Sequence, residues 1–309
     1  MQELKKEEIY FDSADKISRV TGYLYTMPDV PIHAVIQIGH GMCEYIGRYE
    51  TMARYFAGRG VAVAGNDHIG HGRTGRPDAM GQLTPGGRQA VLQDLHTMNG
   101  ILHEKFPGVP VILYGHSMGS FFARWYAEVY GDTIQGLVIS GTAGPSAANK
   151  VGLALSAAIA QAKGESYVSP LMIRLQGDYN KKIPDAQSPN AWLSRDSETV
   201  RAYDEDPYCQ VKFAASSYRE MLAVLDHVSS RQWAESLPKD LPVLLVSGSD
   251  DPVGNYGRGV RRVAAMLSRA GIRDLHCRIW PGGRHEMHQE LGKEKVFASV
   301  YEWLQAHQF

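Results

Sequence analysis

The sequence predicts an α/β fold with a mostly parallel central sheet, helices on both faces of that sheet, and a helical insertion. Short apolar runs rich in Val, Ile and Leu alternate with segments of helical periodicity, as expected for a mostly parallel sheet. These runs lack strict alternation of polar and apolar residues, which is typical of strands buried on both faces. Between residues 144 and 231 the alternation stops, and prolines separate several helical stretches.

The predicted elements follow one another regularly outside that insertion. Two segments, Arg88–Phe106 and Lys293–His307, carry apolar residues at i, i+3, i+4 and i+7, so we expect core-facing helices there. We therefore assign residues 1–143 and 232–309 to two parts of one core, with a helical cap at 144–231 inserted between them. The expected strands are Arg19–Tyr25, Ala34–Ile38, Val61–Gly65, Pro110–Tyr114, Gly136–Ser140, Pro242–Ser247 and Leu275–Trp280. The expected cap helices are Gly152–Lys163, Ser169–Leu175, Ser197–Tyr203 and Ala214–Ser229.

Composition excludes several classes of protein. The 32 Lys and Arg residues nearly balance 33 Asp and Glu residues without forming a basic block, so we expect no nucleic-acid partner. The longest apolar stretch, Val151 to Ala162, is about half of a membrane span. Cys43, Cys209 and Cys277 are too scattered for a disulfide framework or a zinc motif. With a charged amino terminus that lacks a secretory pattern, these features predict a cytoplasmic protein.

The clearest functional pattern is G-x-S-x-G at Gly115 to Gly119, between a predicted strand and a predicted helix. A strand that turns sharply into a helix exposes the central side chain, here Ser117, at the carboxyl end of the strand. The glycines are needed because a Cβ at either position would collide with the neighbouring backbone. The helix amino terminus then points its N–H groups towards a developing negative charge. We therefore expect Ser117 to be a nucleophile.

A serine nucleophile needs a base and an acid, which follow in the order Ser, acid, His in this class of site. Asp250 and Asp251 follow one predicted strand, and His285 and His288 follow another. We favour Asp251 because the next residue is a proline, whereas Asp250 suits a turn-capping role. We favour His285 because it directly follows a Gly-Gly turn, and His288 stays as the alternative.

Two backbone N–H groups must hold the oxyanion of the tetrahedral intermediate. One is expected from Met118, the residue after the nucleophile. The other is expected from Met42, in the glycine-rich loop that ends the strand at Ala34–Ile38. His40 in the same loop is expected to brace the backbone rather than to titrate during catalysis.

Metal and nucleotide chemistry are not indicated. The H-x-x-H pairs at His68 and His71 and at His285 and His288 lack the H-E-x-x-H spacing of zinc hydrolases. The glycines around His40 lack the third glycine of a dinucleotide fingerprint, and no P-loop pattern occurs. We therefore expect neither a metal nor a cofactor.

Four segments resemble the monoacylglycerol lipase and lysophospholipase group of α/β-hydrolases, the serine aminopeptidase S33 or hydrolase 4 type. His40 to Tyr49 is similar to the H-G-x-x-E-H-x-x-R-Y segment of that group, with Tyr45 in place of the usual His. Asp67 to Gly75 resembles its D-x-x-G-x-G-x-S loop, Gly115 to Gly119 its elbow, and Pro281 to Glu286 its P-G-x-x-H-E segment. The resemblance covers nearly the whole chain, with the insertion as its loosest part.

The resemblance implies an α/β-hydrolase fold, the triad Ser117, Asp251 and His285, and oxyanion donors at Met42 and Met118. It also implies a mobile cap over an acyl pocket. We therefore expect a serine carboxylester hydrolase that works through an acyl-enzyme on monoacylglycerol, lysophospholipid or a similar medium or long acyl ester. The expected partner is this small-molecule ester, with a transient membrane or lipid-interface contact through the cap.

Other functions fit the same fold, because a fold alone does not separate ester from amide or thioester substrates. The enzymatic alternatives are a small-ester esterase, an aminopeptidase-type amidase and an acyl transferase. The non-enzymatic alternative is a ligand receptor with a hydrolase fold, although a pure binding protein has no physical need of a complete triad.

Overall fold

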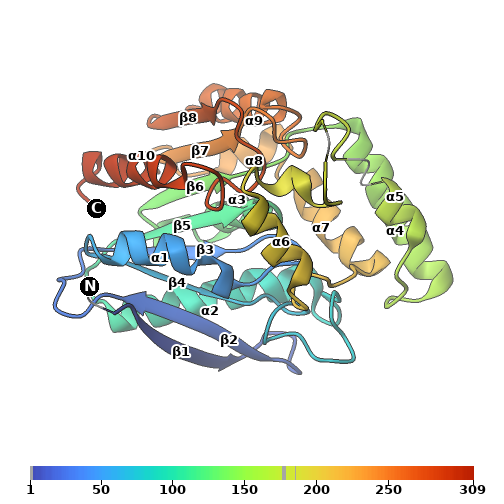
Figure 1. Cartoon of the computed structure of the whole chain (residues 1–309), viewed down its shortest axis with the longest axis horizontal. Coiled ribbons are helices and arrows are strands. Elements are labelled where there is room, and N and C mark those ends of the chain that lie inside the picture. Colours follow the sequence, from blue (N-terminus) through green and yellow to red (C-terminus); the bar gives the residue numbers. More distant parts are fainter. Residues whose placement is uncertain (1–2, 176–178, 185) are drawn as a thin grey trace.

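The computed structural model describes residues 3–175, 179–184 and 186–309, and its centre is an eight-stranded sheet with helices on both faces (Figure 1). The strand order is β1-β2-β4-β3-β5-β6-β7-β8. Strands β3 to β8 run parallel, and β1 and β2 add an antiparallel edge. The predicted fold class is confirmed. The strands are β1 (Lys5–Asp12), β2 (Arg19–Thr26), β3 (Ala34–Gly39), β4 (Val61–Asn66), β5 (Val111–His116), β6 (Gly136–Ser140), β7 (Val243–Gly248) and β8 (Leu275–Trp280).

Helices bury both faces of the central strands, so every residue of β3 to β7 is buried. Successive side chains of a strand point to opposite faces. In β5, Leu113 accordingly joins a core cluster with α2 and α3, whereas Ile112 and Tyr114 join a second cluster with α1 and α10. The core helices are α1 (Glu50–Ala57), α2 (Gly87–Lys105), α3 (Met118–Val129), α8 (Arg231–Ser236), α9 (Arg258–Arg269) and α10 (Lys293–Ala306).

The two sheet edges differ from the sequence prediction. Strand β1 was not expected, because its sequence is mainly charged; its apolar signal is the pair Ile9 and Phe11, which are buried. It pairs with β2 over its whole length. Strand β8 was expected to be buried on both faces but is partly exposed, because it forms the opposite edge.

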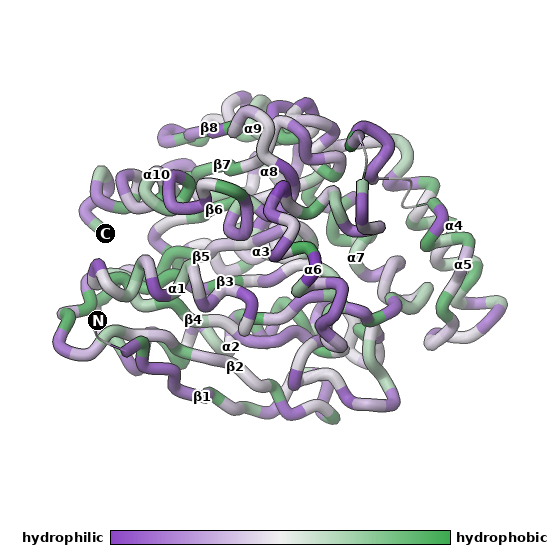
Figure 2. Tube along the Cα trace, viewed as in Figure 1, coloured by the Kyte–Doolittle hydropathy of each residue, from purple (hydrophilic) through white to green (hydrophobic). Residues whose placement is uncertain are grey.

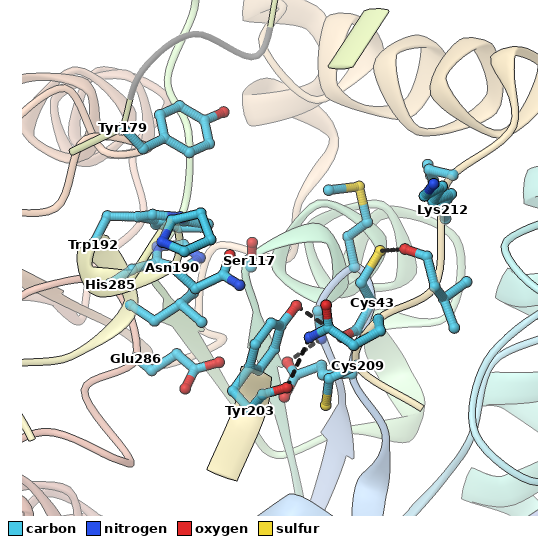
Figure 3. Close-up of a pocket in the computed structure, with 18 of the residues that line it drawn as sticks. Cys43, Ser117, Tyr179, Asn190, Trp192, Tyr203, Cys209, Lys212, His285 and Glu286 are labelled. Atoms are coloured by element: carbon cyan, nitrogen blue, oxygen red, sulfur yellow. Dashed lines mark hydrogen bonds between the residues drawn. The ribbon is translucent and has the colours of Figure 1, made fainter. Parts of the chain in front are cut away.

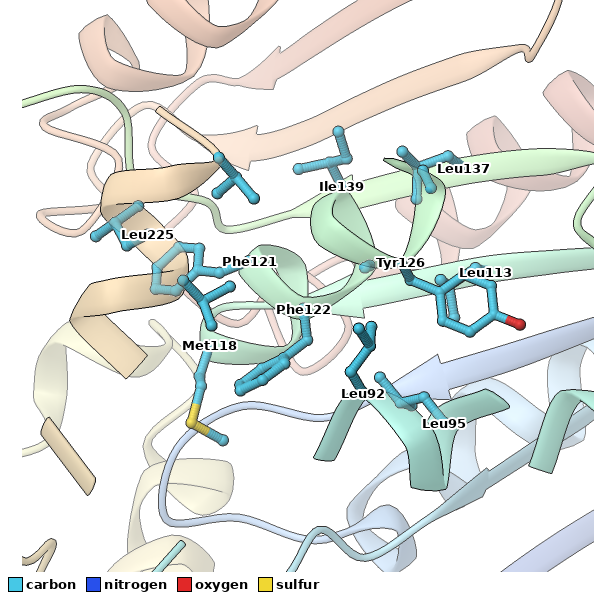
Figure 4. Packing of buried hydrophobic residues seen from close by; sticks show 14 of the residues in the cluster. Leu92, Leu95, Leu113, Met118, Phe121, Phe122, Tyr126, Leu137, Ile139 and Leu225 are labelled. Atoms are coloured by element: carbon cyan, nitrogen blue, oxygen red, sulfur yellow. The ribbon is translucent and has the colours of Figure 1, made fainter. Parts of the chain in front are cut away.

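Between β6 and β7, the described part of the chain is helical and contains no strand. Its helices, before α8, are α4 (Ala147–Lys163), α5 (Pro170–Leu175), α6 (Ser197–Glu205) and α7 (Ala215–His227). Helix α7 contributes Leu225 to the main core cluster, beside Phe121 of α3 (Figure 4). Helix α4 lies outside α7, with α5 beside it at the periphery of the molecule (Figure 1). The predicted boundaries of the cap stay a prediction.

The outer position of α4 and α5 leaves apolar side chains at the surface. Val151 of α4 and Leu175 of α5 are more than half exposed. Figure 2 shows hydrophobic colour along both helices at the edge of the molecule. Among the residues that the structure describes, no helix combines the length and apolar character needed to cross a membrane.

Candidate active site

Ser117 lies at the turn from β5 into α3, at the carboxyl edge of the sheet. Its backbone has φ 50° and ψ −120°, a conformation that non-glycine residues rarely adopt. The turn is held by a hydrogen bond of 3.0 Å from the Ser117 N–H to the Ser140 carbonyl oxygen. A Cβ at Gly119 would lie 2.0 Å from the Gly39 carbonyl oxygen, so α3 rests directly on the backbone at the end of β3. This contact explains why the sequence requires glycine there.

Asp251 and His285 come together from two different strand ends. His285 Nδ1 lies 3.0 Å from Asp251 Oδ1, and both side chains are buried. The Val253 N–H also donates to Asp251 Oδ1, at 2.9 Å. Burial opposes protonation of His285, but the charge of Asp251 and its hydrogen bond outweigh burial, so the pKa of His285 is raised.

The two alternative residues lie in different surroundings. Asp250 is exposed, and its carboxylate accepts a hydrogen bond from the Ser249 hydroxyl at 2.9 Å. His288 stacks on Tyr49, with 4.3 Å between ring centroids and an interplanar angle of 6°. Burial lowers the pKa of His288 to about 3. The structure therefore brings together the predicted pair, Asp251 and His285.

The predicted oxyanion loop is fixed by side chains behind it. Met118 is the first residue of α3, where backbone N–H groups have no acceptor within the helix. Met42 lines the same cavity as Ser117. As predicted, His40 braces this loop: its Nδ1 lies 2.8 Å from the Gly41 carbonyl oxygen, and its Nε2 accepts a hydrogen bond of 2.9 Å from the His68 N–H.

A buried ionic network connects the oxyanion loop to the histidine loop. The Arg48 guanidinium donates two hydrogen bonds to Glu286, at 2.6 and 2.7 Å, and a third to Glu44 at 3.0 Å. Glu44 in turn accepts the Gly41 N–H at 2.5 Å, and Glu286 directly follows His285. Burial raises the pKa of Glu44 to about 7, whereas for Glu286 the charge and hydrogen bonds of Arg48 outweigh burial and lower the pKa. The roles of these three residues were not predicted from the sequence.

Ser117, His285 and Met42 line a cavity of about 520 Å³ between the core and the cap (Figure 3). Trp192 packs beside His285, with ring centroids 4.9 Å apart. Two backbone hydrogen bonds fasten this part of the cap: the His285 N–H donates to Trp192 at 3.3 Å, and the Glu286 N–H donates to Leu193 at 2.8 Å. Other cap residues that line the cavity include Ile173, Tyr179, Asn190, Tyr203, Phe213 and Tyr218.

Further contacts join the cap to the oxyanion loop. The Tyr203 hydroxyl donates to the Cys43 carbonyl oxygen at 2.9 Å. Tyr45, where the resembling group usually has His, donates its hydroxyl to Asp206 at 2.7 Å. The departure at Tyr45 therefore creates a direct bond between the core and the cap.

Comparison with known proteins agrees with this geometry. The family model described as serine aminopeptidase, S33 (Hydrolase_4), matches residues 30–292. The chain belongs to this family. Relatives of this S33 member include the monoacylglycerol lipase of Mycolicibacterium smegmatis, which is 28% identical over 91% of both chains. Human monoglyceride lipase is 26% identical, over 91% of this chain and 85% of its own length.

Solved structures place the S33 member among α/β-hydrolases. A thermostable carboxyl esterase from Bacillus coagulans, in complex with glycerol, has a TM-score of 0.92 and 27% identity, over 98% of this chain and 99% of its own. A soluble variant of the Saccharomyces cerevisiae monoglyceride lipase shares the fold, with a TM-score of 0.77 and 19% identity over 99% and 96% of the two chains. Together with the family match, these relatives identify the S33 member as a carboxylester hydrolase.

Proposed function

We propose that this carboxylester hydrolase uses Ser117 as nucleophile, His285 as general base and acid, and Asp251 as the residue that orients His285. The observation that supports this proposal best is the hydrogen bond of 3.0 Å between His285 and the buried Asp251, because His285 also lines the cavity that Ser117 lines. Asp251 engages Nδ1 of His285, so Nε2 is the nitrogen that exchanges a proton with the serine hydroxyl.

The reaction begins when Ser117 Oγ attacks the ester carbonyl carbon while His285 takes the hydroxyl proton. The oxyanion that forms accepts hydrogen bonds from the N–H groups of Met42 and Met118. His285 then gives its proton to the departing alcohol, which leaves Ser117 acylated. Water then attacks this acyl-enzyme while His285 takes one of its protons, and as the bond from the acyl group to Ser117 Oγ breaks, His285 returns that proton to Oγ and the carboxylic acid is released.

The proposed substrate is a monoacylglycerol, a lysophospholipid or a similar ester with a medium or long acyl chain. Two relatives are named monoacylglycerol or monoglyceride lipases, and a third, 27% identical, is named phospholipase YtpA of Bacillus subtilis. Apolar and aromatic side chains, among them Ile173, Phe213 and Trp192, form much of the cavity wall. Such a wall suits an acyl chain.

The same cavity argues against an aminopeptidase. A free amino group in a substrate needs a carboxylate partner, and the acidic residues that line the described cavity are Glu44 and Glu286. Both carboxylates are already engaged by the Arg48 guanidinium. Neither is free to hold an ammonium group, so the cavity favours esters over amino-terminal amides.

We also propose that the cap touches a lipid interface while substrate enters. Residues 144–184 carry five Lys and Arg but only two Asp and Glu, although the whole chain has a formal charge of −1. An apolar surface bordered by cations suits a lipid surface, above all an anionic one. Among the residues of this segment that the structure describes, five large apolar side chains are exposed: Val151, Tyr167, Leu171, Ile173 and Leu175.

A cytoplasmic location is proposed as well. Cys43, Cys209 and Cys277 are all free cysteines, and Cys43 and Cys209 are buried. Free thiols fit a reducing compartment better than an oxidising one.

The deciding experiment is kcat/KM for 4-nitrophenyl esters from acetyl to palmitoyl, measured for the wild type and for Ser117→Ala. We expect a maximum at a medium or long chain, and a loss of several powers of ten in the variant. A maximum at acetyl or butyryl would indicate a small-ester esterase. Activity above about a hundredth of wild type in Ser117→Ala would make the nucleophile assignment wrong.

A further inference from the structure

Arg124, in the middle of α3, is a buried cation that the proposed reaction does not use. Its side chain is fully buried, and it forms no ion pair with an acid among the described residues. Burial lowers the pKa of its guanidinium to about 9. A buried charge without a carboxylate partner destabilises a fold unless several hydrogen bonds compensate it. The guanidinium of Arg124 donates such hydrogen bonds to Thr142, Ala143 and Val228.

The guanidinium reaches the chain both where it enters the insertion and where it returns from it. Nη1 donates to the Ala143 carbonyl oxygen at 3.1 Å, and Nη2 donates to the Val228 carbonyl oxygen. Ala143 directly precedes the predicted cap at 144–231. Val228 is the residue directly after α7, close to the predicted end of the cap. We call Ala143 and Val228 the cap roots. One side chain thus fixes both cap roots to the same helix.

A second set of hydrogen bonds leads from Arg124 to the nucleophile. Nη1 also donates to Thr142 Oγ1, at 3.3 Å, and Thr142 Oγ1 lies 2.8 Å from Ser120 Oγ. The Ser120 hydroxyl donates to the carbonyl oxygen of Ser117 at 2.6 Å. Continuous polar contacts therefore join the cap roots to the strained residue at the elbow.

Only arginine provides the planar set of donors that this arrangement uses. Lysine carries one compact ammonium group, which lacks the two separate nitrogen atoms that donate to Ala143 and Val228. Trp233 supports the guanidinium from one side, 4.6 Å from its ring centroid, and the indole N–H donates to the Arg124 carbonyl oxygen at 2.8 Å. Packing alone would be served by an apolar residue of similar volume.

We propose that Arg124 is a positioning residue that holds the cap roots in register with Ser117, and so sets how well the enzyme uses long acyl esters relative to short ones. This inference rests on the proposed function. A long acyl chain needs the cap wall of the cavity in place, whereas an acetyl group needs little more than the elbow and the oxyanion loop. Loosening the cap roots should therefore impair long esters selectively.

The test compares Arg124→Lys with Trp233→Phe, which removes the indole hydrogen bond but leaves the guanidinium contacts with the cap roots. The measured quantity is the ratio of kcat/KM for 4-nitrophenyl dodecanoate to that for the acetate. We expect this ratio to fall about tenfold in Arg124→Lys, the effect of losing one buried charged hydrogen bond, and to stay within about twofold in Trp233→Phe. Equal losses on both esters, or a lower melting temperature alone, would overturn the proposal.

A second variant and a measurement of hydrogen exchange test the proposal independently of Arg124→Lys kinetics. If Arg124→Lys does not fold, Thr142→Val removes the oxygen between Arg124 and Ser120, and an unchanged ratio in this variant would also contradict the proposal. Amide hydrogen exchange at residues 143, 144, 146 and 228–230 should be faster in Arg124→Lys than in Trp233→Phe. This readout needs no activity, so it separates a failure of the proposal from a failure of the proposed function. Equal exchange in the two variants would contradict the proposal that Arg124 holds the cap roots.

Discussion

Asp250 and Asp251 are neighbours in the sequence, but their surroundings give them different chemistry. Asp251 is buried against His285, whereas the Asp250 carboxylate is exposed and bonded to Ser249. A buried carboxylate can fix the orientation of an imidazole because water does not compete for its oxygen atoms. The proposed roles therefore depend on burial rather than on residue type.

This difference gives a matched pair of variants. We expect Asp251→Asn to lower kcat by about three to four powers of ten, because an amide favours the wrong tautomer of His285. Asp250→Asn should change kcat less than about twofold, since surface substitutions have small effects. Steady-state kinetics on one ester measures kcat for both variants. If Asp250→Asn lowered kcat more than Asp251→Asn, the catalytic acid would be Asp250 instead of Asp251.

The raised pKa of His285 has a consequence for the pH dependence of the reaction. The base must be neutral to accept the proton of Ser117, so kcat/KM should rise with pH through an apparent pKa above 6.5. A pH–rate profile measures this value. A midpoint below 6.5 would contradict the expected dominance of Asp251 over burial.

Arg48 provides a prediction about stability. Arg48→Met would leave two buried carboxylates, Glu44 and Glu286, without their cation. The free energy of unfolding measured in urea should therefore fall by about 3–5 kcal/mol. Arg201→Met is the control, because its partner Glu198 and Arg201 itself are largely exposed, and such surface pairs contribute less than about 1 kcal/mol. Equal losses in the two variants would show that burial of the network contributes little.

The sequence predicts the pairing of His285 with Asp251 because local turn chemistry, a proline and a Gly-Gly pair, marks each residue. Glu44, Arg48 and Glu286 all lie in segments that resemble the family, but nothing local to them indicates that Arg48 pairs with Glu286, 238 positions away. Only the folded chain brings the two loops together. Contacts of this kind depend on tertiary packing and therefore escape prediction from a single sequence.

The helices of the cap differ in how extensively they contact the core. The segment around η3 (Ala191–Leu193) is bonded to the histidine loop, and α7 contributes to the main core. Helix α4 buries only Ser156 and Ala160, and α5 buries only Met172. Periodicity predicted these helices, but it could not show which of them pack into the core, because their apolar residues look alike in sequence.

The exposed leucines of α5 test the proposed lipid contact. We expect Leu171→Ser combined with Leu175→Ser to weaken binding to phosphatidylcholine–phosphatidylglycerol vesicles at least about tenfold. Each substitution removes exposed apolar surface that would be buried in the membrane on binding. Ile17→Ser, at an equally exposed site far along the chain, should leave binding unchanged. Sedimentation with vesicles measures binding, and kcat/KM on a soluble acetyl ester should be unaffected. Unchanged vesicle binding in the double variant would rule out this surface.

For the molecule as a whole, buried histidines make the stability of the fold depend on pH. Burial is the first cause of the lowered pKa of His40, His68, His71, His116 and His288, and the pKa of His288 falls to about 3. A histidine in the unfolded chain has a pKa of about 6.5, so below this pH the unfolded chain binds protons that the buried histidines of the folded chain do not bind. Each of these histidines therefore supports the fold fully above pH 6.5 and less as the pH falls.

His288→Phe isolates one of these contributions. The variant cannot bind the proton, so its stability relative to wild type should increase by about 2 kcal/mol between pH 7.5 and pH 5. Urea unfolding at the two pH values measures this difference. A difference that does not change with pH, or that has the opposite sign, would contradict neutral burial of His288.

The backbone contact between Gly119 and Gly39 also limits how this enzyme can diversify. With 2.0 Å between an added Cβ and a carbonyl oxygen, no side chain can be introduced where α3 meets β3. Mutational libraries at that junction should therefore yield misfolded chains rather than new activities. Ile173 and Asn190, which line the cavity from the cap, already carry side chains and are at least partly exposed, so other side chains can replace them. New substrate ranges should thus evolve through the cap while the reacting end of the sheet stays constant.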